Sequence, residues 1–348
     1  MATCSEPSSH RLRDTVSPAL DFPRRVVTYS PAYTLVPTYE CFNRCTYCNF
    51  RADPGQSPWL TVDMAVQHLH RAQAEGVIEV LVLSGEVAPH SPRRRAWVRH
   101  IVQICELALS IGLLPHTNVG PLSWDEMAEL KHVNVSMGLM VEQVTPSLLQ
   151  TVHRYAPSKH PEIRLQQLTW AGKMGIPFTT GLLLGLGETQ ADWAAALEAI
   201  ATIHSRYGHI QEVILQPHSL GQRQAEERST LSDLDLVAAV NLATQILPAA
   251  VAIQIPPNLV SPTGLLACLD AGARDVGGIS PVDEVNPDYA HPCPQHLAAT
   301  LAQAGWQLRP RLPVYPQYDD QLPLDLRPRV KAWRHQLEGR LSSPPRLC

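Results

Sequence analysis

The chain lacks the features that would place it in a membrane, on nucleic acid or in a disulfide-stapled fold. None of the apolar runs in its 348 residues approaches the length of a membrane span, and residues 1–10 have no apolar core of a signal peptide. Eight cysteines in so long a chain do not indicate a disulfide scaffold. A formal net charge of −4 gives no electrostatic reason to expect nucleic acid or an anionic membrane as a partner. We therefore expect a cytoplasmic protein.

The composition is that of a globular protein with a large core. Hydrophobic residues make up 45% of the chain and charged residues 17%. The length allows either one large barrel or two smaller domains, and the chain contains no internal repeat. Many of the 31 prolines stand near the two ends. We expect an N-terminal arm over residues 1–27 and a proline-rich, irregular C-terminal extension over residues 309–348, on either side of a folded unit over residues 28–308.

Strand and helix patterns alternate along this folded unit. Short β-rich runs predict eight strands, at 32–37, 77–83, 113–117, 132–140, 177–184, 213–216, 252–255 and 275–279. Apolar periodicity with capping and stop signals predicts helices at 61–75, 93–110, 123–130, 161–174, 189–207, 231–246, 263–271 and 296–304. Such alternation implies parallel strands with helical crossovers, either in a (β/α)8 barrel or in an open doubly wound sheet. The barrel is favoured because polar and glycine-rich motifs follow several strands, where a barrel builds its active site.

Three cysteines in one loop are the most informative feature of the sequence. Cys41, Cys45 and Cys48 are spaced to let a single loop wrap three sulfur atoms around a compact metal centre. Structural zinc and 4Fe-4S clusters usually take four protein ligands, so three local thiolates would leave one iron of a cluster open. The alternative is a zinc knuckle that borrows a distant cysteine. The candidates for that fourth ligand are Cys4, Cys105, Cys268, Cys293 and Cys348.

The cysteine spacing, with Tyr47 directly before the third cysteine, resembles the signature of the radical S-adenosylmethionine (SAM) superfamily. The resemblance implies a 4Fe-4S cluster whose open iron binds SAM. It also implies that Ser84, Gly85 and Glu86 contact the amino group of SAM, although Ser84 replaces the first glycine of the usual motif. The turn with Gly185 and Gly187 resembles the motif that lies beside the adenine.

Other site residues are assigned more loosely. By the same resemblance, Glu142 is a candidate for the SAM ribose, and Arg164 for the SAM carboxylate, although both could equally be surface charges. Strand ends near the predicted mouth offer three substrate contacts, which are His116, Asn118 and Asn258. The later polar loop offers a possible base among Asp283, Glu284, Asn286 and His291, and a simple solvated loop is the alternative.

Residues 27–305 resemble a particular radical SAM family, the CofG-type subunit of FO (7,8-didemethyl-8-hydroxy-5-deazariboflavin) synthase. The segments that carry this resemblance are 29–33, 156–165, 176–185, 211–216, 255–258 and 277–287. It implies a lyase of deazaflavin coenzyme biosynthesis, which closes the ring of an adduct between a tyrosine-derived 4-hydroxybenzyl group and a ribityl-uracil, with loss of ammonia. It also implies an external one-electron donor and a separate sister subunit of the CofH type that supplies the adduct.

Two other kinds of protein remain possible on the sequence alone. The three cysteines would serve another barrel radical SAM enzyme equally well, such as the sister subunit, an aminofutalosine-pathway cyclase or a biotin synthase relative. A non-catalytic metal-binding scaffold would need neither a SAM cleft nor an open iron.

Overall fold

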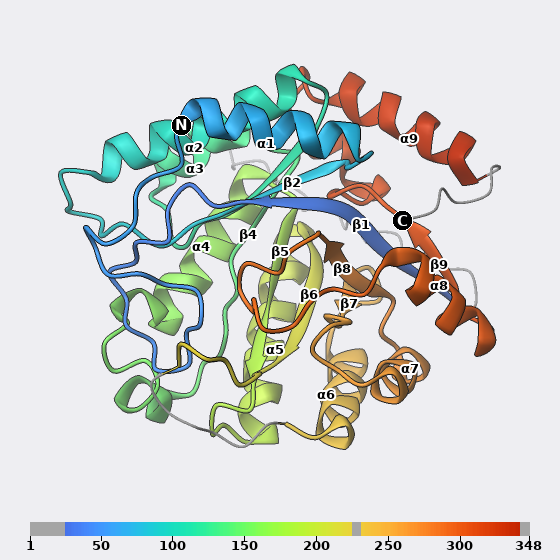
Figure 1. Cartoon of the computed structure of the whole chain (residues 1–348). Coiled ribbons are helices and arrows are strands. Elements are labelled where there is room, and N and C mark those ends of the chain that lie inside the picture. Colours follow the sequence, from blue (N-terminus) through green and yellow to red (C-terminus); the bar gives the residue numbers. More distant parts are fainter. Residues whose placement is uncertain (1–24, 225–230, 342–348) are drawn as a thin grey trace, which may run out of the picture.

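Eight parallel strands close into a barrel in the computed structural model, which describes residues 25–224 and 231–341 (Figure 1). The strands are β1 (Val26–Leu35), β2 (Glu79–Leu83), β3 (Leu114–Asn118), β4 (Ser136–Gly138), β5 (Phe178–Leu184), β6 (Ile210–Pro217), β7 (Ala252–Gln254) and β8 (Asp275–Ile279). Neighbours in the chain are neighbours in the sheet, and β1 pairs in parallel with both β8 and β2. This closure confirms the predicted (β/α)8 barrel and excludes the open sheet.

Helices between the strands surround the barrel. They are α1 (Val62–Ala74), α2 (Arg94–Ser110), α3 (Trp124–Lys131), α4 (Pro161–Met174), α5 (Gln190–Tyr207), α6 (Asp233–Ile246), α7 (Pro262–Ala271) and α8 (Pro294–Gln303). Local signals set several of their ends. Ser123 and Glu126 form a capping box at the start of α3, and Gly175 ends α4 in the left-handed conformation. The apolar faces of the helices and the outer faces of the strands form one continuous core.

All eight predicted strands and all eight predicted helices occur, and all but two strands have bounds within three residues of those predicted. β4 has only three residues within the predicted span 132–140, because it pairs only briefly with β3 and β5. β1 begins at Val26, six residues before the predicted start at Ala32. Its first residues pair with β9 (Gln307–Pro310), a distant strand that local sequence patterns do not announce.

The C-terminal segment closes the lower end of the barrel, where the strands begin. After β9 come the short helix η3 (Pro316–Gln321) and α9 (Arg327–Leu341), so the expectation of an irregular extension holds only in part. Side chains from this segment, including Leu312, Tyr318 and Leu326, pack against the beginnings of β2, β3 and β7. In Figure 1 this segment, drawn in orange to red, runs behind the barrel toward α1 and α2. Most of the predicted arm at residues 1–27 lies outside the described residues.

None of the helices in the described part of the chain combines the length and the apolar character that crossing a membrane would require.

Candidate functional site

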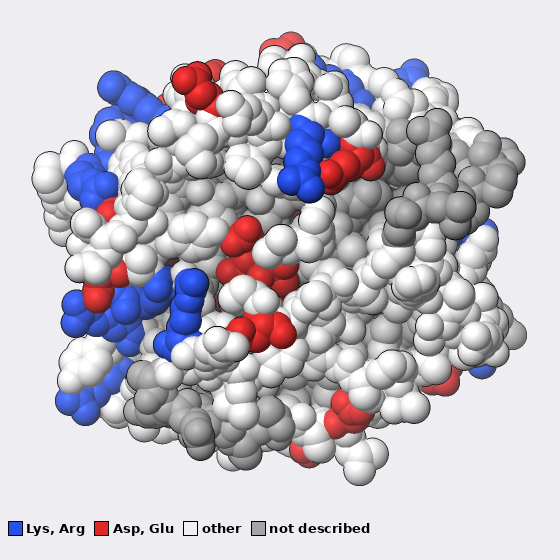
Figure 2. Space-filling model, in the orientation of Figure 1, with Lys and Arg blue, Asp and Glu red and all other residues white. Residues whose placement is uncertain are grey.

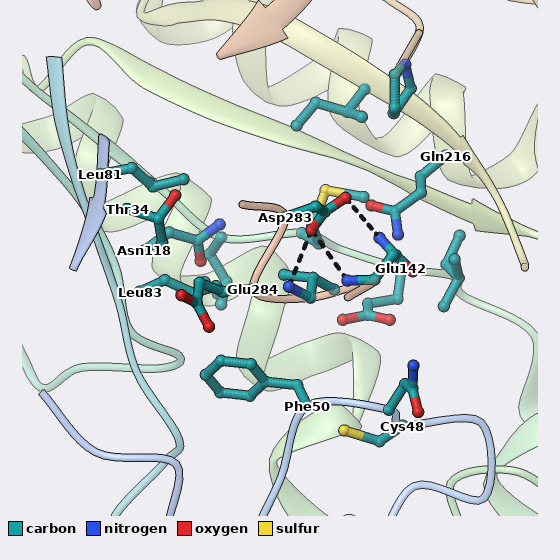
Figure 3. Close-up of a pocket in the computed structure, with 18 of the residues that line it drawn as sticks. Thr34, Cys48, Phe50, Leu81, Leu83, Asn118, Glu142, Gln216, Asp283 and Glu284 are labelled. Carbon is teal, nitrogen blue, oxygen red and sulfur yellow. Dashed lines mark hydrogen bonds between the residues drawn. The ribbon is translucent and has the colours of Figure 1, made fainter. Parts of the chain in front are cut away.

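A cavity of about 340 Å³ runs from the mouth of the barrel into its interior. The cysteine loop lies at its upper end, and residues from seven strands line its walls. Figure 3 shows the spread of these residues, with Cys48 and Phe50 on one side of the space and Thr34 and Leu81 on the other. The arrangement offers room for a cofactor at the mouth with a substrate beneath it.

Backbone hydrogen bonds fix the shape of the cysteine loop. The Phe42 amide donates to the Glu86 carbonyl oxygen at 3.0 Å, and the Cys41 amide donates to the Ala52 carbonyl oxygen at 3.0 Å. On the other side, the Thr46 amide donates to the Val152 carbonyl oxygen at 3.1 Å. The loop is therefore attached to two separate parts of the barrel mouth.

The three thiols of this loop are free and all line the cavity. Burial raises the pKa of the Cys41 thiol, and it raises the pKa of the Cys45 thiol to about 12. Both thiols are thus protonated without a metal, and iron binding must displace their protons. Within the described residues, no group of three or more Cys, His, Asp or Glu side chains is drawn together closely enough to hold one metal ion.

The other described cysteines do not reach the cavity. Cys105 is buried against Thr117 and Asn134, Cys268 is buried in α7, and Cys293 begins α8. Cys4 and Cys348, the remaining candidates for a fourth ligand, lie outside the described residues. The donor set at the mouth therefore fits a cluster held by three thiolates.

The turn after β2 brings backbone against the cysteine loop. A Cβ atom on Gly85 would lie 2.2 Å from the Glu40 carbonyl oxygen, so only glycine fits there. Ser84 accepts a hydrogen bond from Trp97 Nε1 at 3.0 Å and donates to the Gly85 carbonyl oxygen at 2.9 Å. Its side chain thus braces the turn, which explains how a serine replaces the usual glycine.

Glu86 follows this turn and enters a buried polar network. It accepts hydrogen bonds from Asn43 Nδ2 at 2.9 Å, from Ser158 Oγ and from Arg164 Nη2 at 3.2 Å. Arg164 is 2% exposed, and its guanidinium also donates to the carbonyl oxygens of Ser158 and Met140. Arg164 therefore lines the cavity chiefly as the centre of this network, and binding the SAM carboxylate would require it to exchange partners.

Glu142 occupies a strained position opposite the cysteines. Its φ of 69° is unusual for a residue other than glycine, and hydrogen bonds between its backbone and β5 hold it there. Its carboxylate accepts from Lys159 Nζ and from the Tyr47 hydroxyl at 2.8 Å. Burial favours the neutral acid, but Lys159 and then Arg164 outweigh burial and lower the pKa of Glu142 to about 2. A permanent carboxylate therefore faces the mouth.

The glycine turn after β5 lies just outside the cavity. Gly185 and Gly187 have φ values of 94° and 112°, and the Glu188 carboxylate accepts from the Gly185 amide at 2.6 Å. Neither glycine lines the cavity, whereas Leu183 at the end of β5 does. The predicted contact between this turn and the adenine stays a prediction.

The three predicted substrate contacts all line the cavity. His116 Nδ1 lies 2.6 Å from Ser136 Oγ, and burial, followed by the charge of Arg311, lowers the pKa of His116 to about 3. Asn118 stands one inward-facing position higher on β3. Asn258 donates to Asp283 at 2.8 Å and to the Tyr289 carbonyl oxygen at 2.9 Å, so it is partly committed to shaping the mouth.

The polar loop after β8 folds over the mouth. Its four candidate bases, Asp283, Glu284, Asn286 and His291, all line the cavity. The Tyr39 hydroxyl donates to Glu284 at 2.6 Å, and Asn49 of the cysteine loop donates to Asp288 at 3.1 Å. Figure 2 shows acidic side chains in a hollow near the middle of the visible face, with basic side chains gathered along one side. The loop therefore ties the cysteine loop to the opposite rim.

The floor of the cavity is a charged cluster that sequence reasoning missed. Arg311, which directly follows β9, donates to Glu212 at 2.6 Å and to both carboxylate oxygens of Asp275 at 2.5 and 2.8 Å. Burial raises the pKa of Glu212 well above its usual value, whereas at Asp275 the Arg311 charge outweighs burial and lowers the pKa. Glu79, a third acid at this level, also has its pKa raised by burial.

The motifs did not single out three other residues of the site. Asn43 and Lys159 line the cavity, and Asn43 donates a hydrogen bond to Ser158. Asn43 stands inside the cysteine loop, and Ser158 and Lys159 fall within the segment 156–165 that carries the family resemblance, so a signal was present for these three. Of the floor residues, only Glu212 falls in such a segment, 211–216. Glu79, Asp275 and Arg311 had no signal, because they come from β2, β8 and the C-terminal segment and meet only in the fold.

Comparison with known proteins places this geometry in a class. Residues 35–200 match the model of the radical SAM superfamily, and this span contains the three cysteines, the Ser84–Glu86 turn and Glu142. The barrel with three free thiols at its mouth is therefore a radical SAM barrel, which uses a 4Fe-4S cluster and SAM.

Long alignments identify the particular family. The chain is 59% identical over 319 residues to the 7,8-didemethyl-8-hydroxy-5-deazariboflavin synthase of Synechococcus elongatus, covering 91% of this chain and 95% of the relative. It is 56% identical over 313 residues to the protein of that name from Gloeobacter violaceus, covering 90% and 97%. The chain belongs to the 7,8-didemethyl-8-hydroxy-5-deazariboflavin synthase family.

Solved structures support the fold alone. The [FeFe]-hydrogenase maturase HydG from Carboxydothermus hydrogenoformans superposes with a TM-score of 0.69 at 16% identity, covering 92% of this chain and 79% of that chain. Methylornithine synthase (PylB) superposes with a TM-score of 0.63 at 16% identity, covering 85% and 86%.

Proposed function

We propose that this protein is the radical SAM lyase that forms the deazaflavin ring system. Its substrate is the adduct 5-amino-5-(4-hydroxybenzyl)-6-(D-ribitylimino)-5,6-dihydrouracil. Its products are 7,8-didemethyl-8-hydroxy-5-deazariboflavin, ammonia, methionine and 5′-deoxyadenosine. The observation that carries the proposal is the family's long, high-identity match combined with one cavity that joins three free thiols to an enclosed polar interior.

Cys41, Cys45 and Cys48 would hold the 4Fe-4S cluster, which, with SAM bound to its open iron, supplies a carbon radical that removes hydrogen from the substrate. The backbone of Gly85 and the carboxylate of Glu86 face the place where the amino group of SAM would lie. Glu142 offers a fixed carboxylate for the ribose hydroxyls. We assign Lys159 as a further candidate for the SAM carboxylate. Its ammonium lies beside Glu142, and its positive charge is close enough to Cys45 to oppose the rise in the pKa of that thiol on burial.

The loops that cover the mouth would protect the radical. The cysteine loop is tied by Asn49 to Asp288 of the β8 loop, and the Arg223 amide donates to Asn49 at 2.8 Å from the β6 side. These contacts close the rim from three directions and limit the access of water to the reacting atoms. Leu83 and Leu183, at the upper ends of β2 and β5, offer apolar surfaces in the cavity that would pack against the flat rings of the adduct.

Two partners and a compartment belong to the proposal. A sister radical SAM subunit would join the hydroxybenzyl group to the ribityl-uracil and deliver the adduct, since the described residues form one barrel. An external one-electron donor would reduce the cluster. A reducing cytoplasm is the compartment that suits an oxygen-sensitive cluster.

The test compares two substrate mixtures under anaerobic conditions. With SAM, reductant and the preformed adduct, the purified protein should form the fluorescent deazaflavin together with methionine and deoxyadenosine. With tyrosine and the ribityl-uracil in place of the adduct, and no sister subunit, it should form none. Deazaflavin from the unjoined substrates would contradict this division of labour. Robust SAM cleavage without product from the adduct would move the enzyme to another branch of the superfamily.

A further inference from the structure

Inward-facing side chains of the barrel form layers that differ in chemistry. Glu79 of β2 and Glu212 of β6 both line the lowest part of the cavity, close enough for their charges to interact, and Thr179 of β5 pairs with Glu212. Above them, Thr34 pairs with Leu81, and Ile214 pairs with Gln254. Because strands rise about 3.3 Å per residue, the lowest and highest layers of β2 are separated by roughly 13 Å of strand. The cavity is therefore deep enough to separate two ends of one substrate.

The lower two layers hold polar groups with unused hydrogen-bonding capacity. Gln254 is 9% exposed and lines the cavity, and among the described residues its side-chain amide has no hydrogen-bond partner. The Thr34 hydroxyl likewise lines the cavity without a partner in the described part of the chain. Gln254 is buried and Thr34 is partly exposed to the cavity. An amide or hydroxyl that lines a cavity without a protein partner can bond a polar ligand, and the cost of leaving it unpaired grows with burial.

The floor beneath these groups is anchored and cannot move away. Arg311 holds Glu212 and Asp275, and the Tyr315 hydroxyl donates to Asp275 at 3.0 Å. Glu79 also lines the cavity at this level, and burial raises the pKa of its carboxyl group. Neighbouring groups that donate and accept at fixed positions match a chain of hydroxyl groups, each of which also does both.

We propose that the lower two layers, with Gln254, Thr34 and Glu79, form a subsite for the ribityl chain of the adduct. This inference rests on the proposed function and assigns the orientation of its substrate. The hydroxybenzyl and uracil rings then lie above, beside Leu83 and Leu183 and next to the cysteine loop. In Figure 3, Thr34 and Leu81 lie on the side of the cavity away from Cys48, as this orientation requires.

The orientation has a chemical purpose. C–H bonds on carbons that carry a hydroxyl group are weak, so every ribityl carbon would compete with the intended hydrogen donor if it came near the radical. The ribityl chain emerges from the reaction unchanged, and it can therefore be held at the far end without hindering ring closure. Binding the polyol at the floor selects the reacting C–H bond by position.

Isotope transfer tests this directly. The adduct is prepared with deuterium on the ribityl carbons, and deoxyadenosine is analysed by mass spectrometry after anaerobic turnover. Wild-type protein should give deoxyadenosine free of chain deuterium. A double variant, Gln254→Leu with Thr34→Val, should give deuterated deoxyadenosine and less deazaflavin per deoxyadenosine. Gln216→Leu, the same change one layer higher on β6, is the matched control and should transfer no deuterium.

If the protein does not turn over the adduct, a binding measurement still tests the subsite. Quenching of deazaflavin fluorescence gives the Kd of the product and of an analogue whose chain is an unsubstituted pentyl group. Wild-type protein should prefer the ribityl compound, and each lost hydroxyl contact should reduce that preference about three- to tenfold. Cluster content and circular dichroism verify that the variants are folded.

The outcomes separate the two proposals. Deuterium in wild-type deoxyadenosine, or an unchanged preference in the double variant, would overturn the subsite. Failure of wild-type turnover with a ribityl preference that depends on Gln254 would overturn the proposed reaction while leaving the subsite in place.

Discussion

The mouth and the floor of this barrel are both polar, but they are built in opposite ways. At the mouth, the three thiols come from one loop of the chain, and local spacing alone brings them together. At the floor, Glu212, Asp275 and Arg311 come from β6, β8 and the C-terminal segment, and only barrel closure unites them. The residues of the mouth can therefore be predicted from a motif, whereas those of the floor can be identified only once the fold is known.

The largest effect should come from the mouth. Changing Cys41, Cys45 or Cys48 to Ala should abolish the iron-sulfur chromophore, because a cluster with one open iron cannot spare a further thiolate. Iron and sulfide content with the visible absorption spectrum gives the measurement after anaerobic reconstitution. Cys268→Ala, outside the cavity, is the control and should keep the cluster. A full cluster signal in the Cys45 variant would contradict the assignment.

The next effect should come from the floor. Arg311→Met leaves two buried acids without their cation and should lower the free energy of unfolding by about 3–5 kcal/mol, measured by denaturant titration. Arg95→Met removes a surface pair with Glu129, in which the arginine side chain is 58% exposed, and should cost less than about 1 kcal/mol. Equal losses in the two variants would mean that the floor cluster does not hold the C-terminal segment in place.

Loss of a SAM contact at the mouth should have a smaller effect and should leave the cluster intact. Glu142→Ala should weaken SAM binding by about 1.5–3 kcal/mol, on the order of tenfold or more in Kd, because a charge-assisted hydrogen bond is lost. Arg164→Leu should act in the same direction, in part by releasing Glu86. Exposed Glu162 on α4 provides the control variant Glu162→Gln. Unchanged SAM affinity in both site variants, measured at equal iron content, would show that the contacts are misplaced.

The last prediction concerns the pH dependence of stability, where the expected effect per pH unit is small. Buried His116 has a folded-state pKa of about 3, below its unfolded value of about 6.5. Its neutral form contributes fully to stability above about pH 6.5, and that contribution is lost as pH falls toward 3. The loss should reach at most about 1.4 kcal/mol per pH unit. His116→Gln should flatten this part of the stability curve between pH 6 and 4, which denaturant titrations at several pH values would measure. An identical slope in the variant would place His116 in contact with solvent.

The sequence predicted the barrel well because each strand and helix carries its own local signals. Helix α4 has the predicted bounds 161–174, since Pro161 begins it and Gly175 ends it. The start of β1 and the strand β9 were missed, because each depends on pairing with the other across more than 270 residues. In the site, the cysteines, Glu86 and Glu142 stand at motif positions and were predicted. Lys159 lies in a segment that carries the family resemblance but was not singled out, and Arg311 meets Glu212 and Asp275 only because the C-terminal segment closes the barrel.

The central claim is that chemistry at the mouth acts on an adduct held by the interior. The most direct measurement is a single anaerobic turnover of the purified adduct, in which deoxyadenosine and deazaflavin are quantified together. The account predicts that the fluorescent deazaflavin rises in step with deoxyadenosine and that neither forms in the Cys45→Ala variant. Abundant deoxyadenosine without deazaflavin from the wild-type protein would contradict it.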